Sequence, residues 1–299
     1  MHLPTLRQLQ FLCSVADHGS FSRAAEACNV TQPTLSSAIK EIEALLGVQL
    51  IEREARGASL THSGAATVER ARRILADSAD LVSAAQQAGV PLAGPFRLGA
   101  IPTIAPFLLP KALAEMRKAH PDLKLYLRED QTDRLLDSLR ARKLDAALIA
   151  LPWDAPGIET QALFDDEFLL VVPPEHDLMR KPTLGARDLG DEEVLLLEDG
   201  HCLRDHAVSV CRLPDRRSGA DVTATSLPTL VHMVAGGLGV SLLPKVAVDG
   251  GLTAGTNVEI RPFDNPLIGR QIGVAWRSRS PRAAEAQLIG QIVREVMVN

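Results

Sequence analysis

A short segment rich in glycine and proline divides this sequence into two parts with different hydrophobic patterns. Residues 89–95 read Gly-Val-Pro-Leu-Ala-Gly-Pro, a composition typical of a hinge. Before the hinge, apolar residues recur at helical spacing; after it, short apolar runs alternate with helical patterns. The change of pattern predicts a mainly helical N-terminal part followed by an α/β domain.

The N-terminal part predicts three short helices, a hairpin and one long helix. Ser20 is a candidate N-cap of the second helix and Thr31 of the third, which ends at Gly47. Residues 48–61 suit a two-stranded hairpin, and residues 62–88 carry an uninterrupted helical pattern. The second and third helices would form a helix-turn-helix unit.

The third predicted helix opens with short polar side chains that suit base edges and phosphates. The candidate DNA contacts on this helix and on the following hairpin, which would act as a wing, are Gln32, Thr34, Ser36, Ser37, Lys40, Arg53 and Arg56.

The charge balance gives the opposite indication. The chain has 32 Lys and Arg against 37 Asp and Glu, a net charge of −5, which argues against a nucleic-acid partner. Residues 1–90 hold 8 basic and 9 acidic side chains. On spacing and charge alone, the N-terminal helices could therefore be a dimerisation module whose polar residues are solvated.

Specific residue runs carry a family resemblance. They are Leu9-Gln10-Phe11, Gly19-Ser20-Phe21-Ser22-Arg23-Ala24-Ala25, Thr31-Gln32-Pro33-Thr34-Leu35-Ser36, Ile39-Lys40-Glu41-Ile42-Glu43 and Leu60-Thr61-His62-Ser63-Gly64. Together they resemble the winged helix-turn-helix of LysR-type transcriptional regulators. Cys28 and Ile51 depart from the family's more usual Leu and Phe, at core-type positions.

This resemblance implies a domain plan and a set of partners. Residues 1–61 would be the winged domain and 62–93 the dimerising linker helix with its hinge. Residues 94–299 would form a regulatory domain related to periplasmic binding proteins, with lobe I at about 94–166 and 267–299 and lobe II at about 167–266. The resemblance adds Ser22, Arg23, Thr31 and Pro33 to the DNA contacts. It also implies promoter DNA, a homotetramer built as a dimer of dimers, and RNA polymerase as a partner.

The C-terminal part predicts a mostly parallel sheet because strands and helices alternate. The expected strands are 96–100, 123–128, 146–150, 167–172, 194–197, 240–243 and 272–276. The expected helices are 107–119, 132–141, 203–211, 227–235 and 282–298. About two hundred residues suffice for two small lobes with a cleft between them.

Two of the four cysteines, Cys202 and Cys211, lie nine positions apart on a predicted helix. Nine helical residues separate Cα atoms by about 13 Å and place them on opposite faces, whereas a disulfide needs Cα atoms within about 7 Å. The two thiols can therefore bridge only if the helix unwinds, which would make the segment a redox-driven bistable element.

Cys202 is the better candidate for reaction with peroxide because it lies near the helix N-terminus, where the dipole favours a thiolate. Peroxide would convert that thiolate to a sulfenic acid, which Cys211 would resolve to a disulfide.

Less specific interpretations of the cysteines stay open at this point. Both thiols could be ordinary core residues, and the histidines beside them could be surface groups. A zinc site could be formed by His201, Cys202, His206 and Cys211, but the set lacks a close Cys-x-x-Cys pair, so no metal is predicted. Cys13 and Cys28 lie on apolar helical faces and are expected to be inert.

The segment 195–205, Leu-Leu-Leu-Glu-Asp-Gly-His-Cys-Leu-Arg-Asp, together with Cys211, closely resembles the redox segment of peroxide-sensing members of the LysR family. This resemblance implies a peroxide pocket made by Thr103, Thr132, His201, Cys202 and Arg270, with Asp205 as a neighbour. The threonine hydroxyls would hold the peroxide oxygens, and Arg270 would stabilise the thiolate and the departing hydroxide.

The sequence therefore predicts a peroxide-sensing transcriptional regulator that is not an enzyme and needs no cofactor. Two alternatives remain: a LysR-type regulator that binds a small effector between its lobes, and a thiol peroxidase that uses Cys202. No apolar run reaches the ~18 residues of a spanning helix, and Met1 to Gln10 lacks signal-peptide character. We therefore expect a cytoplasmic protein without a membrane partner.

Overall fold

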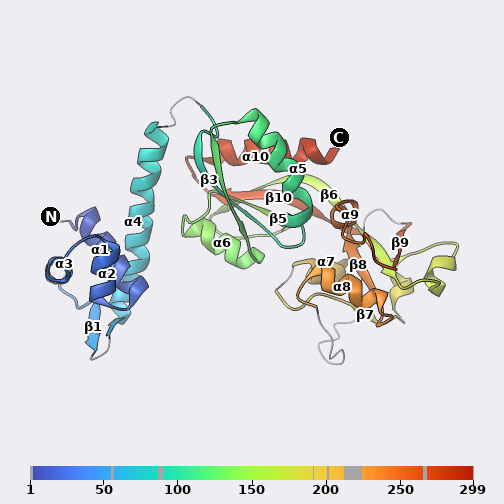
Figure 1. Ribbon diagram of the computed structural model, residues 1–299, viewed down its shortest axis with the longest axis horizontal. Coiled ribbons are helices and arrows are strands. Elements are labelled where there is room, and N and C mark those ends of the chain that lie inside the picture. Colours follow the sequence, from blue (N-terminus) through green and yellow to red (C-terminus); the bar gives the residue numbers. More distant parts are fainter. Residues whose placement is uncertain are drawn as a thin grey trace. The chain divides into compact units, whose positions relative to one another are not determined.

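The computed structural model describes residues 3–54, 57–86, 90–190, 192–200, 202–211, 224–264 and 268–298 (Figure 1). The chain divides into two compact units, Met1–Ala88 and Gly89–Asn299. Each unit is described by itself below.

The first unit is a helical domain with a small hairpin. Its elements are α1 (Leu6–His18), α2 (Phe21–Ala27), α3 (Gln32–Leu46), β1 (Ile51–Glu54), β2 (Gly57–Leu60) and α4 (His62–Gln86). The core holds apolar side chains from α1, α2 and α3, among them the fully buried Leu12, Leu35 and Ile42. β1 and β2 pair antiparallel, as a hairpin requires.

The caps that start and end α3 confirm the sequence prediction. The Thr31 hydroxyl accepts a hydrogen bond from the Thr34 backbone N–H, which satisfies one of the free donors of the first turn. Gly47 ends the helix in a left-handed conformation at φ 69°, where a side chain would be strained. Ser20 occupies the cap position of α2, but its side chain makes no capping bond.

The second unit combines one curved sheet with helices on both faces. Its strands are β3 (Gly94–Ala100), β4 (Leu123–Glu129), β5 (Ala146–Leu151), β6 (Ile158–Val172), β7 (Val194–Leu195), β8 (Val240–Pro244), β9 (Glu259–Pro262) and β10 (Gly269–Arg277). Its α-helices are α5 (Ala105–Ala119), α6 (Thr132–Arg140), α7 (Cys202–Cys211), α8 (Leu227–Ala235), α9 (Lys245–Asp249) and α10 (Ala283–Val298). Two short 3₁₀ turns lie at Asp177–Arg180 and Ala186–Leu189.

The sheet is mixed, so the prediction of a mostly parallel sheet was wrong. The strand order is β4-β3-β5-β10-β6-β8-β7, with β9 beside β6. β3 runs parallel to β4 and β5, and β7 runs parallel to β8. β10 runs antiparallel to both of its neighbours, β5 and β6, and β6 also runs antiparallel to β8 and β9. The physical reason is that β10 returns from far along the chain and inserts between β5 and β6 without a crossover helix to set a parallel direction.

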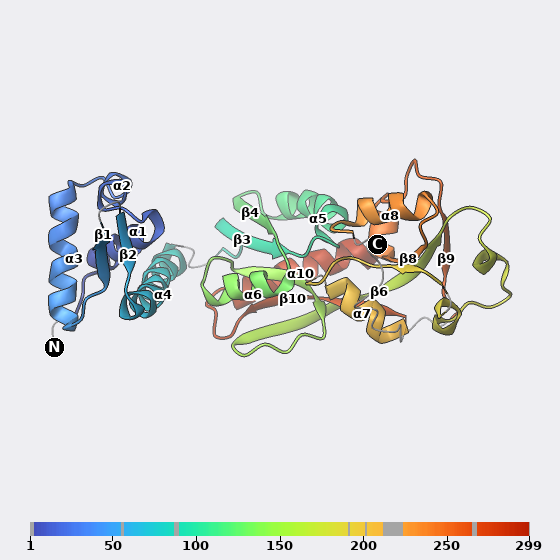
Figure 2. The same cartoon turned by 90° about the horizontal axis from the view of Figure 1, so that it is seen from below.

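Two hydrophobic cores define two lobes of this unit. In lobe I, α5 and α10 cover one face of the sheet and α6 the other (Figure 1). In lobe II, α8 and α7 lie on opposite sides of β8 (Figure 2). The 15-residue strand β6 continues from one lobe into the other, because its first half pairs with β10 and its second half with β8 and β9.

Helix α7 contributes to both cores. Cys202, its first residue, packs in the core of lobe I, whereas Leu203 and Ala207 pack in the core of lobe II. A change in the conformation of α7 would therefore disturb the packing of both lobes at once.

Among the described residues, no helix combines the length and the apolar composition that crossing a lipid bilayer requires.

Candidate functional site

Cys202 is the first residue of α7 and lines a small recess between the lobes. The residue is 5% exposed, and the recess is lined by Ile101, Pro102, Thr103, Gln131, Thr132, Gly200 and Cys202. About 170 Å³ of empty space separates the lining atoms, but none of it admits a whole water molecule. A small oxidant would therefore enter only with a slight movement of these side chains.

Thr132, the first residue of α6, brings an unusual polar group to this recess. Its side chain is buried, and its Oγ1 is the buried side-chain polar atom without a hydrogen-bond partner among the described residues. An unpaired buried hydroxyl costs about 1–3 kcal/mol. In a small site such a group is explained most simply by a guest that can bond with it.

Thr103 and Arg270 form a second, fully paired group at the edge of the recess. The Arg270 Nη1 donates to Thr103 Oγ1 at 2.7 Å, and its Nε donates to Asp166 Oδ2 at 3.0 Å. The other Asp166 oxygen accepts from the Val246 N–H at 3.0 Å. Burial raises the pKa of the Asp166 carboxyl, and the Arg270 guanidinium and the Val246 N–H oppose that rise.

The backbone just before Cys202 is held close to lobe I. Gly200 adopts a φ of +93°, and a Cβ there would approach the Gln131 side chain to 3.0 Å. Glycine is therefore favoured for its left-handed conformation and for the close contact.

His206 lies one helical turn beyond Cys202 and is half-buried. Its Nδ1 is 2.7 Å from the Cys202 carbonyl oxygen, and its Nε2 is 3.1 Å from the carbonyl oxygen of Leu151 at the end of β5. The ring thus joins the first turn of α7 to the sheet of lobe I.

In the first unit, α3 presents a polar face opposite its buried apolar face. Leu35, Ile39 and Ile42 are buried. The exposed predicted DNA contacts on and before this helix are Thr31, Gln32, Pro33, Thr34, Ser37 and Lys40. Ser22 and Arg23 of α2 are also exposed, and the Ser22 hydroxyl donates to the Gln32 side chain at 3.1 Å.

Comparison with known proteins then decides the family. Residues 6–65 match the model described as bacterial regulatory helix-turn-helix protein, lysR family, and residues 60–298 match the LysR substrate binding domain. The chain belongs to the LysR family.

Relatives of this LysR-family chain include named peroxide regulators. It is 41% identical, over 98% of its length and 95% of the relative, to a probable hydrogen peroxide-inducible genes activator of Streptomyces viridosporus. A structure of a full-length OxyR cysteine variant from Pseudomonas aeruginosa is 37% identical, covers 98% of this chain and 96% of its own, and has a TM-score of 0.79. A hydrogen-peroxide-bound OxyR cysteine variant from Corynebacterium glutamicum is 36% identical, covers 99% and 94%, and has a TM-score of 0.68.

The structure brings together part of the predicted peroxide site of this LysR-family protein. Thr103, Thr132 and Cys202 line the recess, and Arg270 reaches it through Thr103. Asp205 is exposed and is not among the lining residues.

Other predicted residues lie at or beyond the limits of the described structure. Cys211 ends α7 with its side chain outside the described part, and ten helical residues place it about 13 Å along the axis from Cys202. His201 and Arg56 lie outside the described residues, and Arg53 is described only as part of β1. Ser36 is partly buried on α3.

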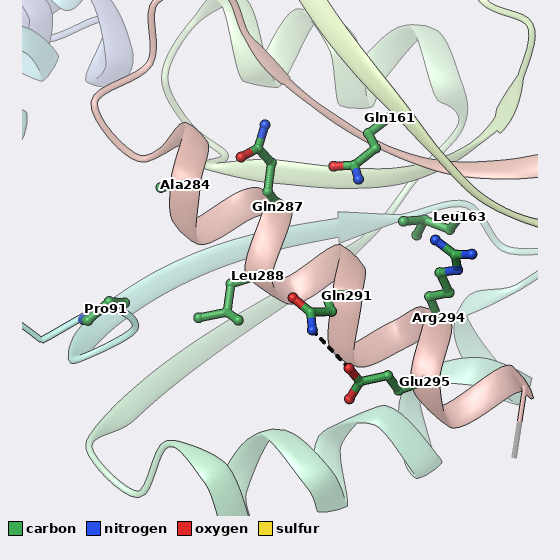
Figure 3. A pocket seen from close by; sticks show the side chains of 9 residues that line it. All are labelled: Pro91, Gln161, Leu163, Ala284, Gln287, Leu288, Gln291, Arg294 and Glu295. Atoms are coloured by element: carbon green, nitrogen blue, oxygen red, sulfur yellow. Dashed lines mark hydrogen bonds between the residues drawn. The ribbon is translucent and has the colours of Figure 1, made fainter.

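A larger groove lies elsewhere, on the outer side of lobe I. It is lined by Pro91, Gln161, Leu163, Ala284, Gln287, Leu288, Gln291, Arg294 and Glu295. Figure 3 shows Pro91 on the segment before β3 and the other side chains along α10 and the first half of β6, with the Gln291 amide donating to Glu295 at 2.9 Å. Every lining residue belongs to the lobe I side, so this groove is separate from the recess at Cys202.

Sequence reasoning missed Asp166 and His206. Asp166 is separated from Arg270 by 104 positions, so no local spacing could pair them. His206 was considered only as a zinc ligand or a surface group. Its position four residues after Cys202 does place both on one helix face, and that was the one available signal.

Proposed function

We propose that this LysR-family chain is a transcriptional regulator that responds to hydrogen peroxide through Cys202 and Cys211. The observation that carries the proposal is the shared recess of the Cys202 thiol and the unpartnered Thr132 hydroxyl. Peroxide carries two oxygens that both donate and accept hydrogen bonds, so after a slight movement of the lining side chains it would bond with the unpartnered hydroxyl. The peroxide-related names of the relatives support the same function.

In the proposed reaction, the Cys202 thiolate attacks one peroxide oxygen, and the O–O bond breaks. The products are a Cys202 sulfenic acid and hydroxide, which takes up a proton to leave as water. Thr132 and Thr103 would hold the two oxygens, while Arg270, acting through Thr103, would stabilise the charge that develops on the departing oxygen. Cys211 then attacks the sulfenic sulfur, which forms the disulfide and releases a second water.

The signal would reach DNA because the disulfide cannot form while α7 is helical. Unwinding α7 removes Cys202 from the core of lobe I and Leu203 and Ala207 from that of lobe II. We propose that this repacking changes how subunits of a homotetramer, a dimer of dimers, place their α3 helices on promoter DNA and engage RNA polymerase. Cytoplasmic localisation and the DNA-contact roles of α3, Arg53 and Arg56 belong to the same proposal.

The recess also bears on the two alternative functions. Pockets for organic ligands typically measure about 300–1,000 Å³, whereas the recess at Cys202 does not admit even a whole water molecule. It therefore favours peroxide over an organic effector at this site. A thiol peroxidase would turn over many peroxide molecules with a reductant, whereas a sensor would react once and stay oxidised until reduced.

One experiment tests these functions together. Purified protein is treated with one equivalent of peroxide, disulfides are mapped by mass spectrometry, and promoter DNA is footprinted in both redox states. We expect a Cys202–Cys211 disulfide and a changed footprint. Absence of that bond, or an unchanged footprint, would contradict the proposal. Rapid consumption of excess peroxide in the presence of thioredoxin or glutathione would instead indicate the peroxidase.

A further inference from the structure

His206 makes two contacts that point to a role in setting the redox switch. One ring nitrogen faces the Cys202 carbonyl oxygen at 2.7 Å and the other faces the Leu151 carbonyl oxygen at 3.1 Å. Leu151 belongs to β5 of lobe I. Leu203 and Ala207, which lie on α7 on either side of His206 in the sequence, pack in the core of lobe II. The ring therefore crosses the boundary between the lobes at the first turn of α7.

Both partners of the ring are carbonyl oxygens, which only accept hydrogen bonds. Each contact therefore needs a hydrogen on the facing nitrogen, and the ring makes both bonds together only when both nitrogens carry one.

We propose that His206 is the positioning residue that latches α7 in the reduced state and sets how readily the disulfide closes. This inference rests on the proposed function. His206 lies between Cys202 and Cys211, inside the segment that must unwind before the two sulfurs can meet. Unwinding the first turn breaks the bond to the Cys202 carbonyl and carries the ring away from Leu151. The latch thus stabilises the dithiol form and has no counterpart in the disulfide form.

If His206 is a latch, replacing it shifts the equilibrium between dithiol and disulfide in the opposite direction from the shift expected for a side chain without such contacts. Alanine has a higher helix propensity than histidine, so His206→Ala would favour the helical, reduced form if the ring made no useful contact. Loss of the ring's hydrogen bonding to these carbonyls has the opposite effect and favours the disulfide.

The test measures the midpoint potential of the full-length protein in glutathione buffers, with the disulfide quantified by mass spectrometry. We expect His206→Ala to shift the equilibrium about tenfold toward the disulfide, which is about 30 mV more negative for a two-electron couple. Disulfide closure after a peroxide pulse should also be faster. His206→Gln keeps one N–H donor group, which can bond one of the two carbonyls, and should recover part of the shift.

Ser209→Ala is the matched control because Ser209 is exposed on the same helix and its substitution also raises helix propensity. It should leave the midpoint unchanged or shift it slightly toward the dithiol. An unchanged midpoint in His206→Ala, or a shift toward the dithiol, would overturn the latch while leaving the proposed function intact. If the unmodified protein formed no Cys202–Cys211 disulfide, the proposed function itself would fail.

Discussion

Cys13 and Cys202 are buried to nearly the same extent, at 7% and 5% exposure, but their surroundings differ. Cys13 lies inside α1, among the apolar side chains of the first unit's core. Burial raises the pKa of its thiol; the Arg72 charge opposes that rise, and the Asp17 charge adds to it by a smaller amount. Cys202 is the first residue of α7 and shares its recess with two threonines.

The comparison predicts that burial alone does not make a cysteine inert. At Cys13 the apolar surroundings outweigh the nearby Arg72 charge, so burial still raises the pKa of the thiol. A thiol at a helix N-terminus lies at the positive end of the helix dipole, and Cys202 also shares its recess with an unpartnered hydroxyl. The four predictions that follow test this difference, from the largest expected effect to the smallest.

Replacing the two sulfurs in turn tests the comparison most directly. Cys202→Ser should abolish the peroxide-dependent change of the DNA footprint completely while leaving DNA binding intact, because the reacting sulfur is lost. Cys211→Ser should leave Cys202 oxidisable, as trapped by a sulfenic-acid reagent, but unable to form the disulfide. Loss of DNA binding in Cys202→Ser would indicate a structural cysteine instead, like Cys13.

The ion pair beside the recess should have a large effect on stability. Arg270→Leu leaves the Asp166 carboxyl buried without its cation, which should lower the free energy of unfolding by about 3–5 kcal/mol. Urea denaturation measures this change. The double variant with Asp166→Leu should regain most of the loss, and equal losses in the single and double variants would show that the pair is not the cause.

The hydroxyl of Thr132 should matter for reaction but not for folding. Thr132→Val keeps the shape of the side chain and removes the unpaired oxygen, so the rate of Cys202 oxidation should fall about 10- to 100-fold. The free energy of unfolding should stay the same or rise by about 1 kcal/mol. Stopped-flow oxidation and urea denaturation measure the two effects.

Thr103→Val is the contrasting variant, since its hydroxyl already accepts from Arg270. It should lower the free energy of unfolding by about 1–3 kcal/mol, because an Arg270 donor loses its partner. If Thr132→Val reacted with peroxide at the unmodified rate, the hydroxyl would have no part in holding the oxidant.

The smallest effect is expected at Cys13. Cys13→Ala should cost about 1 kcal/mol in the free energy of unfolding through a small cavity, with an unchanged peroxide response in the footprint. A reduced response would mean that the first unit's cysteine takes part in sensing and that the comparison fails.

Much of the fold followed from local patterns. Helical spacing and caps placed α3 between Thr31 and Gly47, and the sequence expected α8 with the same bounds as the structure has. The first half of β6 was missed because residues 158–166 do not alternate between apolar and polar residues along a buried face. The direction of β10 was missed for a different reason, because strand pairing between distant segments leaves no local signal.

The site divides in the same way between local and distant information. Cys202 at the start of a helix, Cys211 nine positions later and the polar opening of α3 could all be read from neighbouring residues. Thr103, Thr132 and Arg270 were predicted as site residues only from the family resemblance.

The sequence by itself determined most of the helices, the caps of α3, and that two thiols on one helix are too far apart to bridge. Only the tertiary structure decided that Thr132 lacks a partner, that Asp166 pairs with Arg270, and that His206 joins α7 to β5. The reason is physical: helix starts depend on residues within one or two turns of each other, whereas burial and pairing depend on which distant segments the sheet brings into contact.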